Sequence, residues 1–516
     1  MTGTESSSGV CEGKEKTKKM LSIAEIGRFI DNDINSEKKR LAKVGQKYYE
    51  AEHDILKYRL FYWNADGKLV EDETRSNIKI SHPFFMILSD QLTSYMLSFK
   101  DNPIKARKNV EGLQDYLDQY FDDDFWSEIG DLISGTYNKG FEYLYAYKNE
   151  EDRLAFECAD SMGVVEVRAK DTDDQCEYII YWYIDRIDKG RKKIKRMQVW
   201  TDTETHYFVQ ADGGQIQKDN TVTINPRPHV VFTDENGAKM GQGLGFIPFW
   251  RLDNNKKQFS GLKPIKHIID DYDLHACSLS NNLKDFDTPL HVVKGFDGHG
   301  EDGLNKLQTN LKTKKIVGVD AEGGVEVKTV DVPYEARKVK LDLDKENIFI
   351  FGMGFDPTKV GDGNITNVVI QSRYTLLDLK ANALEKRLKK LLKKIIKVVL
   401  DEINTMNDKD YQLKDVEIKK FEHSITTNES ENIQNAKTEA ERKQIEVNTI
   451  LNVAAQIGDE QVLKAVCEVM DWDFEELKGE LENLQEEKKL ADAQKTLNKI
   501  VPEDDDEPID EPPVVE

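Results

Sequence analysis

The chain has 516 residues, more than the roughly 250–300 at which a single hydrophobic core stops growing, so we expect two or more packed units. Its 73 Lys+Arg against 96 Asp+Glu leave a net charge of -23, which excludes a general attraction to DNA phosphates because that attraction needs clustered cations. Five scattered cysteines without CxxC spacing exclude a disulfide framework and a cysteine zinc site.

The N-terminal half changes from helical to strand patterns. Residues 1–20 are polar, lack a signal-peptide core and are expected to be disordered. Helical apolar spacing then dominates to about Tyr147. Beyond Arg153, short β-branched and aromatic runs between Asp/Gly/Lys clusters predict an antiparallel meander of about 100 residues. The runs cover residues 156–158, 164–167, 178–183, 194–201 and 205–209.

The centre of the chain returns to helix and then to a small strand-containing module. We predict a helix over residues 261–286, followed by strands at 290–293, 315–319 and 325–330 with Gly-rich turns between them. Residues 332–353 have a mixed pattern. Residues 354–363 contain three glycines and Pro357, which predict a loop with room to move.

The clearest helix covers residues 366–403. Leucine, isoleucine and valine recur there every three or four residues, and seven Lys/Arg lie between Lys386 and Lys397 on the other faces. We interpret it as a packed helix with charged flanks; contact with nucleic acid, a membrane or another subunit is the alternative. A strand over 416–421 precedes a largely helical region over 429–499. The tail from Val501, with eight acidic residues and four prolines, is expected to be disordered and solvated.

Glycine-rich and hydrolase motifs lack the context that their chemistry requires. Gly241-Gln242-Gly243-Leu244-Gly245 has glycine spacing similar to a dinucleotide loop, but Ile247-Pro248-Phe249 follows where a helix should begin. GxxxxGK[ST], GxSxG and HExxH are absent from the sequence, and no apolar run reaches about 18 residues. We therefore expect a soluble, non-enzymatic protein made in the cytoplasm, with no catalytic residues and no cofactor.

One polar helix face invites a metal hypothesis. His267, Asp271 and His275 are spaced by four residues and project from one side of the expected helix, although a solvated polar face explains the same spacing. Asp270, Asp271 and Asp273 have no electrophile or acid–base partner around them in the sequence. The prediction is that no metal is bound and no reaction is catalysed there.

Taken in order over roughly residues 48–477, several segments resemble portal proteins of long-tailed bacteriophages. The strongest is Gly243-x-Gly245-Phe246-Ile247-Pro248-Phe249. A small Ser-Gly pair and an alanine of the family correspond here to Thr366-Asn367 and Val369, so the turn into the long helix is shaped differently. The other matching segments are 254–255, 261–262, 268–273, Ser278, 281–282, 348–349, 363–370, 376–381, 416–421, 428–429, 447–451 and 459–460.

The resemblance implies an α+β portal fold with a mixed α/β wing, a helical stem, a small β-containing clip, a long kinked helix and a helical C-terminal crown. The implied boundaries are 1–39 for an N-terminal flexible segment and helix, 40–258 and 404–428 for the wing, 259–287 and 332–352 for the stem, 288–331 for the clip, 353–366 for the tunnel loop, 367–403 for the kinked helix, 429–500 for the crown and 501–516 for the tail.

The resemblance also implies a function and partners. The chain would form a ring of about a dozen copies at one capsid vertex of the virion, used for genome packaging, head–tail joining and genome ejection. Its partners would be the packaging ATPase (the terminase large subunit), a head-completion adaptor, major capsid and scaffolding proteins, and double-stranded DNA without sequence specificity. No membrane contact is implied.

Two sets of site residues follow from the resemblance. Lys359 is the only cation between Gly354 and Asn364 in the sequence. Repeated in every subunit of the ring, it would form a sparse basic ring in contact with phosphates. The tunnel-loop candidates are Asp356, Pro357, Lys359, Asp362 and Asn364. The clip candidates for partner contact are Lys294, His299, Lys312, Lys314 and Lys315.

Three other functions are open at this point. Another head–tail adaptor or minor capsid protein would form no closed ring. An enzyme would need a metal at His267, Asp271 and His275, and a membrane-surface protein would use the lysine-rich helix.

Overall fold

The computed structural model describes most of residues 20–479 and divides the chain into two compact units. The gaps are 74, 109, 150–152, 169–175, 188, 234–238, 287–289, most of 295–323, 329–333, 357, 359–366, 422–428, 454–457 and most of 471–476. One unit comprises Met1–Asp362 with Gln371–Ile425, and the other Gly363–Ile370 with Thr426–Glu516. The mixture of helices and strands confirms the α+β class.

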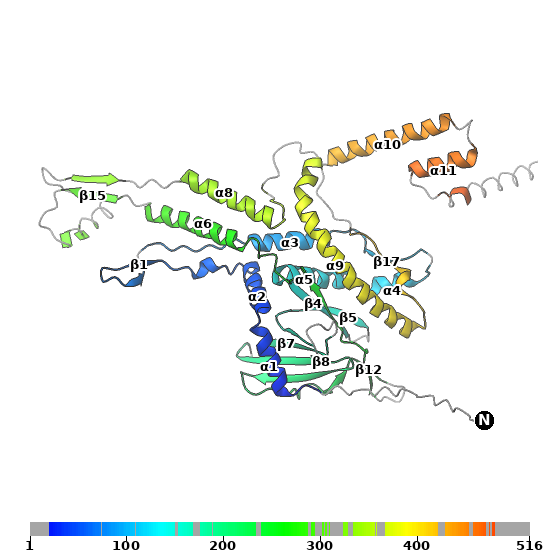
Figure 1. Ribbon diagram of the computed structural model, residues 1–516, viewed down its shortest axis with the longest axis horizontal. Helices are drawn as coiled ribbons and strands as arrows, with labels where there is room; N and C mark the ends of the chain where they lie inside the picture. Colours follow the sequence, from blue (N-terminus) through cyan, green and yellow to red (C-terminus); the bar gives the residue numbers. More distant parts are fainter. Residues whose placement is uncertain are drawn as a thin grey trace, which may run out of the picture. The chain divides into compact units, whose positions relative to one another are not determined.

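The core of the first unit is built around the long helix α9 (Asn367–Asn407). Its leucine, isoleucine and valine face is buried from Leu384 to Ile403, which confirms the packed helix predicted from their spacing. The helix runs four residues further than predicted. Packed against the same core are α3 (Phe84–Met96) and α5 (Asp123–Lys139) (Figure 1).

Helices near the N-terminus attach this core to a sheet. The helix α1 (Ile23–Ile34) starts with a capping box from Ser22 and Glu25, and buries Ile26 and Ile30 among residues of the strands. After it, α2 (Glu37–Tyr49) buries Lys39, whose ammonium donates to the carbonyl of Val164 at 2.8 Å and pairs with Asp33 at 3.0 Å.

The strands form two main antiparallel sheets. The strands β6 (Val164–Val167), β7 (Tyr178–Ile187), β8 (Lys192–Trp200) and β9 (Glu204–Ala211) pair in sequence order, which confirms the predicted meander. The first predicted strand is instead β5 (Leu154–Ala159), an edge of a separate sheet in the order β14–β4–β5.

The central strand of that second sheet corrects the N-terminal prediction. It is β4 (Phe141–Lys148), paired with β14 (Phe249–Asp253), and it lies where helix was expected up to Tyr147. The helix α5 ends at Gly140, whose φ of 96° needs a residue without a Cβ. A Cβ there would also lie 2.2 Å from the carbonyl oxygen of Gln258.

Short strands and one long-range pair complete the first unit. The predicted closing strand is β17 (Val416–Ile418), which pairs with β3 (Ile104–Ala106) and so joins residues far apart in the sequence. The remaining elements are the 3-10 helices η1 (Asp54–Lys57) and η3 (Leu413–Asp415), α4 (Leu113–Tyr120), and the strands β1 (Phe61–Trp63), β2 (Leu69–Glu71), β10 (Gln217–Lys218), β11 (Arg227–Pro228), β12 (Val230–Thr233), β13 (Lys239–Gln242), β15 (Leu290–Lys294) and β16 (Gly324–Lys328).

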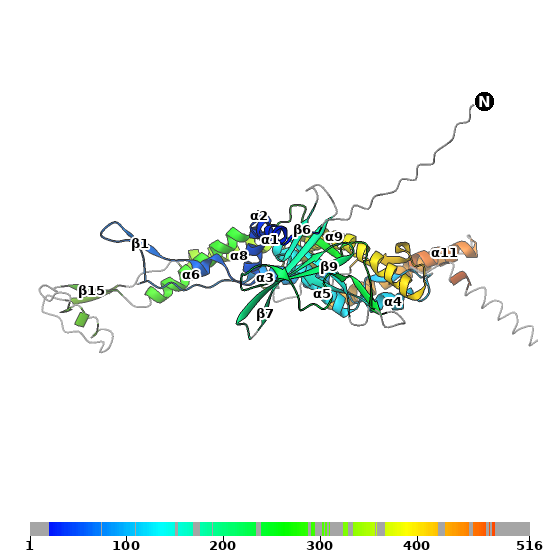
Figure 2. The same cartoon turned by 90° about the horizontal axis from the view of Figure 1, so that it is seen from below.

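Two helices extend from the core side by side. They are α6 (Lys266–Phe286) and α8 (Tyr334–Phe351), seen together in Figure 2. The first starts five residues later than predicted, because residues 261–265 form turns that bury Leu262 and Ile265. Residues 334–351, expected to be mixed, form one helix whose buried face carries Asp344, Ile348 and Phe349. The predicted strand at 315–319 lies outside the described residues.

The second unit is helical where it is described. It contains α10 (Glu429–Asn452) and α11 (Asp459–Met470), which agrees with the predicted helical C-terminal region. The portal-type boundaries given above remain predictions, and residues 1–19 and 501–516 lie outside the described residues.

Candidate functional site: the paired helices and the loop before α9

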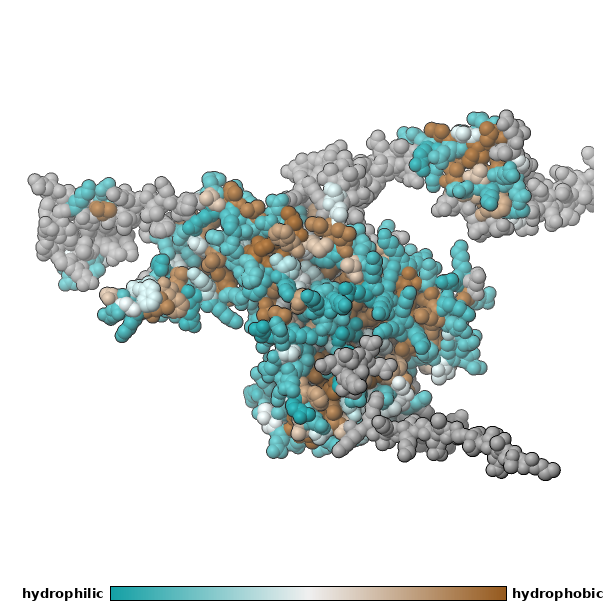
Figure 3. All heavy atoms as spheres, in the orientation of Figure 1, coloured by the Kyte–Doolittle hydropathy of each residue, from teal (hydrophilic) through white to brown (hydrophobic). Residues whose placement is uncertain are grey.

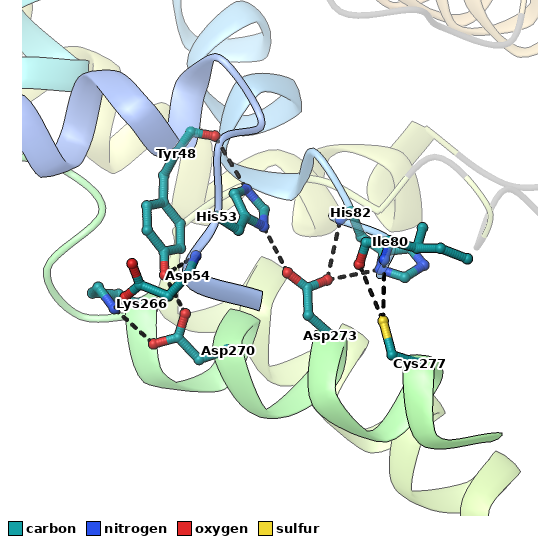
Figure 4. Close-up of polar contacts among 9 residues, drawn as sticks. All are labelled: Tyr48, His53, Asp54, Ile80, His82, Lys266, Asp270, Asp273 and Cys277. Atoms are coloured by element: carbon teal, nitrogen blue, oxygen red, sulfur yellow. Dashed lines mark hydrogen bonds and ion pairs between the residues drawn. The ribbon is translucent and has the colours of Figure 1, made fainter. Parts of the chain in front are cut away.

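The three neighbouring aspartates of α6 have three different surroundings. Asp273 is fully buried, whereas Asp270 and Asp271 are partly exposed. Figure 4 shows Asp270 and Asp273 with their polar contacts. Asp270 accepts a short hydrogen bond from the Tyr48 hydroxyl and pairs with Lys266 at 2.8 Å. Spacing along the helix does not predict these differences in burial, because other segments of the same chain pack against α6 and decide which carboxylate is removed from water.

Asp273 joins two distant segments to α6. Its Oδ2 lies 2.6 Å from Nδ1 of His53, and its Oδ1 lies 2.7 Å from Nδ1 of His82. The other ring nitrogen of His53 lies 3.3 Å from the carbonyl oxygen of Tyr48, so the ring is held at both nitrogens. Burial alone would raise the pKa of Asp273, but the hydrogen bonds from His53 and His82 lower it below its ordinary value.

An extended segment, residues 76–82, lies along the same face of α6. Every second backbone N–H donates to a side chain one helical turn further back, and the spacings match because two extended residues span about 6.6 Å and four helical residues about 6 Å. This ladder satisfies donors that would otherwise need a strand partner. The pairs are Ser76 with Asp285 (3.2 Å), Ile78 with Asn281 (2.6 Å), Ile80 with Cys277 (3.2 Å) and His82 with Asp273 (3.1 Å).

Asp271 lies on a different face of α6 and links it to α8. Its carboxylate accepts from Lys340 at 2.5 Å and lies 3.5 Å from Nε2 of His275. His267 is exposed on the first turn of the helix. In the described part of the chain, no three His, Cys, Asp or Glu side chains are grouped to hold a metal ion. The ion pair with Lys340 accounts for Asp271 without a metal.

The first residues after α8 are anchored on both sides. Gln91 of α3 accepts from the backbone N–H of Phe355 at 3.1 Å and donates to its carbonyl at 2.7 Å. The ring of Phe355 stacks on Tyr374 of α9 at 4.7 Å. Lys380, also on α9, donates to the carbonyl of Gly352 at 2.9 Å. The segment 353–366 therefore starts from a fixed base.

Burial changes the charge of that lysine. The amino group of Lys380 lies 4.6 Å over the ring of Tyr137 and 3.4 Å from its hydroxyl, although the side chain as a whole keeps some exposure. Burial lowers the pKa of Lys380 to about 7. A cation next to the loop base is thus favoured only near or below neutral pH.

Among the predicted tunnel-loop residues, Asp356 lies within the described residues. It accepts from the backbone N–H of Thr358 at 3.0 Å and lies 3.5 Å from Nζ of Lys345 on α8. The Asp356 carboxylate is therefore paired with Lys345 of the same chain. Pro357, Lys359, Asp362 and Asn364 lie outside the described residues.

Among the predicted clip residues, Lys294 is described. It ends β15, which pairs with β16, and its exposed ammonium lies 3.2 Å from Glu326 across the hairpin. His299, Lys312, Lys314 and Lys315 lie outside the described residues. Their part in partner contact remains a prediction.

Part of the lysine-rich face of α9 borders a cavity of about 650 Å³. Arg387, Lys390 and Lys394 form one wall, and Gly245 and Arg251 are among the residues opposite. Arg251 is already neutralised, because it pairs with Glu166 at 2.6 Å and with Asp253 at 2.8 Å. The strand β14 follows the glycines near 243 where a dinucleotide loop needs a helix start, so these glycines do not make a dinucleotide loop.

Sequence reasoning missed His53, His82 and the hairpin β1–β2. A usable signal for the hairpin is the Asn64-Ala65-Asp66-Gly67 turn between aromatic and aliphatic runs. The histidines carry no such local signal. Over the residues that are described, none of the helices has the length and apolarity needed to cross a bilayer.

The sequence is similar to known proteins over most of its length. A family model described as "Phage portal protein, SPP1 Gp6-like" matches residues 28–494. A "Portal protein" of Bacillus phage SPP1 is 27% identical over 349 residues, which cover 67% of this chain and 66% of the relative. A "Portal protein" of Clostridium phage phiCD119 is 25% identical over 364 residues, covering 67% of this chain and 75% of the relative. The chain thus spans about two thirds of the SPP1 relative.

Solved structures that are similar to this chain at a low level come from gene transfer agent particles. A chain from the neck of a native GTA particle, computed with C12 symmetry, is 14% identical with a TM-score of 0.37; the match covers 75% of this chain and 89% of that one. A chain from the virion of a native gene transfer agent particle is 13% identical with a TM-score of 0.36, covering 74% and 88%.

Proposed function

The chain belongs to the SPP1 Gp6-like phage portal protein family, and on that premise we propose that it forms the ring-shaped DNA channel at one capsid vertex. The family match over residues 28–494 carries the proposal. In this role the protein serves genome packaging, head–tail joining and genome ejection. It is a structural component of the virion, and we assign no catalytic step to it.

The charge of the chain suits a channel through which DNA slides. A net charge of -23, repeated around a ring, repels phosphates, whereas many lysine contacts would hold the DNA in place. The anchored base at Gly352–Phe355 would let the following residues reach the DNA while their start stays fixed. DNA is therefore contacted through its backbone, without sequence readout.

The partners follow from the same role. We propose that the β15–β16 hairpin region contacts the packaging ATPase during filling and the head-completion adaptor afterwards. Exposed Lys294 supports a polar contact surface there. Major capsid and scaffolding proteins would surround the ring, and the ring would contain about a dozen copies.

Negative-stain imaging of the purified protein tests the ring. We expect closed rings with a central hole and about twelvefold symmetry. A protein that stays monomeric at micromolar concentration would contradict the proposal. It would leave a head–tail adaptor or minor capsid protein as the better interpretation.

The DNA contact is tested at Lys359. We expect Lys359→Ala to change the packaging rate and DNA retention, and to reduce their salt dependence, because one phosphate contact per subunit is lost. Lys386→Ala, an exposed lysine on α9, is the matched control and should leave these measurements unchanged. Equal behaviour of the two variants would remove the proposed role of Lys359.

A further inference from the structure

The hairpin β1–β2 exposes an unusual amount of apolar surface. All six strand residues are exposed, and Trp63 keeps 70% of its surface accessible. Trp63 pairs with Leu69 across the strands, and Phe61 lies two residues earlier on the same face. None of the three belongs to a described core cluster of the chain. The hairpin therefore presents an aromatic face that its own described chain does not cover.

The hairpin is nevertheless a built element. Asn64 Oδ1 accepts from the backbone N–H of Asp66 at 3.1 Å and of Lys68 at 2.9 Å, and Gly67 supplies the left-handed φ of 69° that the turn needs. Arg59 pairs with Glu71 across the base at 3.0 Å. A lone two-stranded hairpin is marginally stable in water, so a partner surface would complete it.

The chain on either side of the hairpin is held on α6. On the N-terminal side, Asp54 pairs with Lys266 at 2.7 Å and His53 binds Asp273. On the C-terminal side, the ladder of residues 76–82 follows α6 for three turns. Residues 58–73, called the arm below, are thus presented from a fixed position. An arm held in place loses less conformational entropy when it docks.

A second apolar surface lies on α8. Val339 and Leu343 are 64% and 52% exposed, and Ile350 is exposed as well. Offsets of four and seven residues place the three within about 40° of one another on the helix. Buried Asp344 and Ile348 lie on another side of the helix. This α8 stripe, residues 339, 343 and 350, is apolar surface that faces away from the core.

The segment that carries the arm and the helix α8 contact different faces of α6. Figure 1 shows the arm on one side of α6 and α8 on the other, and Figure 3 shows brown, hydrophobic spheres along α8 and pale to brown spheres over the hairpin. The ladder uses Asp273, whereas the contact with α8 uses Asp271. A head-to-tail ring requires two different patches on each subunit, and the arm and α8 supply two such patches.

We propose that the arm of one copy docks on the α8 stripe of the neighbouring copy. Trp63, Leu69 and Phe61 supply the aromatic anchor, and Val339 and Leu343 supply the surface that receives it. Large exposed apolar patches mark interaction sites, and a central aromatic residue carries much of the affinity in such contacts. The proposal rests on the ring proposed above, because it assigns one contact between its neighbours.

Substitution of the anchor tests the contact. We expect Phe61→Ser with Trp63→Ser to raise the concentration needed for half of the chains to be in rings by about tenfold or more, measured by mass photometry. Both positions are exposed, so circular dichroism of the variant should match the wild type. Ile184→Ser, at an exposed position on β7, is the control and should leave ring formation unchanged.

Cross-linking tests the geometry directly. Lys68→Cys and Asp342→Cys chains with different affinity tags are co-expressed and treated with a short bismaleimide; both positions are exposed next to the two patches and leave Trp63 and Leu343 in place. A covalent dimer carrying both tags is expected only when both substitutions are present, and each substitution with a wild-type partner controls for the native cysteines. Formation of rings without this dimer, or rings of Phe61→Ser/Trp63→Ser at the wild-type concentration, overturns the docking and leaves the portal function intact. Wild-type protein that forms no ring overturns both.

Discussion

The core around α9 and the pair α6–α8 are stabilised by different forces. In the first, Leu388, Leu392 and Ile395 are fully buried, so stability comes from removing apolar area from water. In the second, Asp273 and Asp271 bind donors from three other segments, so stability depends on directional contacts between named atoms. The stability of the first region thus depends on the volume of its side chains, and the stability of the second depends on the charge of its side chains.

The two regions also differ in the kind of side chain that they expose to solvent. The core encloses its apolar side chains, whereas α8 buries polar Asp344 and exposes Val339 and Leu343. The buried face of α8 combines Asp344 with Ile348 and Phe349, while its exposed apolar residues remain available for a neighbour. Substitutions in these regions are expected to have effects of different size.

The largest effect is expected for a cavity in the core. Phe85 is fully buried and stacks on Tyr137 with ring centres 5.4 Å apart. Phe85→Ala should lower the free energy of unfolding by about 3–5 kcal/mol, measured by denaturant titration of the ring-forming protein under dissociating conditions. Exposed Phe351→Ala is the control, with an expected change below about 1 kcal/mol. Equal losses would contradict the assignment of the core.

The next effect concerns the buried carboxylate of α6. Asp273→Ala leaves His53 without its partner and should cost about 3 kcal/mol, because breaking a buried ion pair strands a polar group. Hydrogen exchange should show loss of protection at residues 76–82 and in α6, with the α9 core unchanged. Asp271→Ala, at a partly exposed pair, should cost no more than about 1 kcal/mol. Similar exchange profiles for the two variants would be incompatible with the ladder.

Acid should act on the same site. The pKa of Asp273 is lower in the folded chain than in the unfolded one, so its contribution is present above the ordinary carboxyl range and disappears as pH falls below about 4. Hydrogen exchange at pH 5 and pH 3 should therefore show selective loss of protection in α6. The Asp273→Ala variant should lack this difference.

Lys380, at the boundary of the core, gives a pH dependence of the same sign in a higher pH range. Its folded pKa of about 7 lies below the unfolded value near 10.5, so the unfolded chain binds more protons between these pH values and stability rises with pH there. One group contributes at most about 1.4 kcal/mol per pH unit. Lys380→Met should remove this slope between pH 7 and 10. An unchanged slope would show that the amino group is hydrated.

The smallest effect on stability is expected at the β15–β16 hairpin. Lys294 and Glu326 are both exposed, so Lys294→Ala should change the unfolding free energy by less than about 0.5 kcal/mol. If this region contacts the packaging ATPase, the same substitution should weaken its binding in a pull-down with the purified ATPase. Loss of stability without loss of binding would reverse that assignment.

Local patterns predicted several elements and failed at others for identifiable reasons. The α9 stripe and the β6–β9 meander follow from spacings of about 3.6 and 2 residues, and both were found. The strand β4 was missed because Phe141–Leu144 is buried on both faces and shows no alternation. In α8, charged residues separate the apolar ones and obscure the period, since part of its buried face is Asp344.

The candidate site was only partly accessible to sequence reasoning. The glycines and Pro357 predicted a loop before α9, most of which lies outside the described residues, and the order of several short matches indicated the family. Asp356 contacts Lys345 and Thr358, which are close to it in the sequence. The start of the segment, at Phe355, is held by Gln91, which lies more than 260 residues earlier. No local pattern relates residues so far apart.

The sequence by itself determined the α+β class, the family, the long buried helix and the acidic character of the chain, because each depends on periodicity, order or composition. Only the tertiary structure decided which of the α6 aspartates became a buried anchor. Asp270, Asp271 and Asp273 are equivalent in sequence, and burial of Asp273 depends on His53 and His82 arriving from other segments. A charge is stable inside a protein only where its partners are present, and folding alone brings them there.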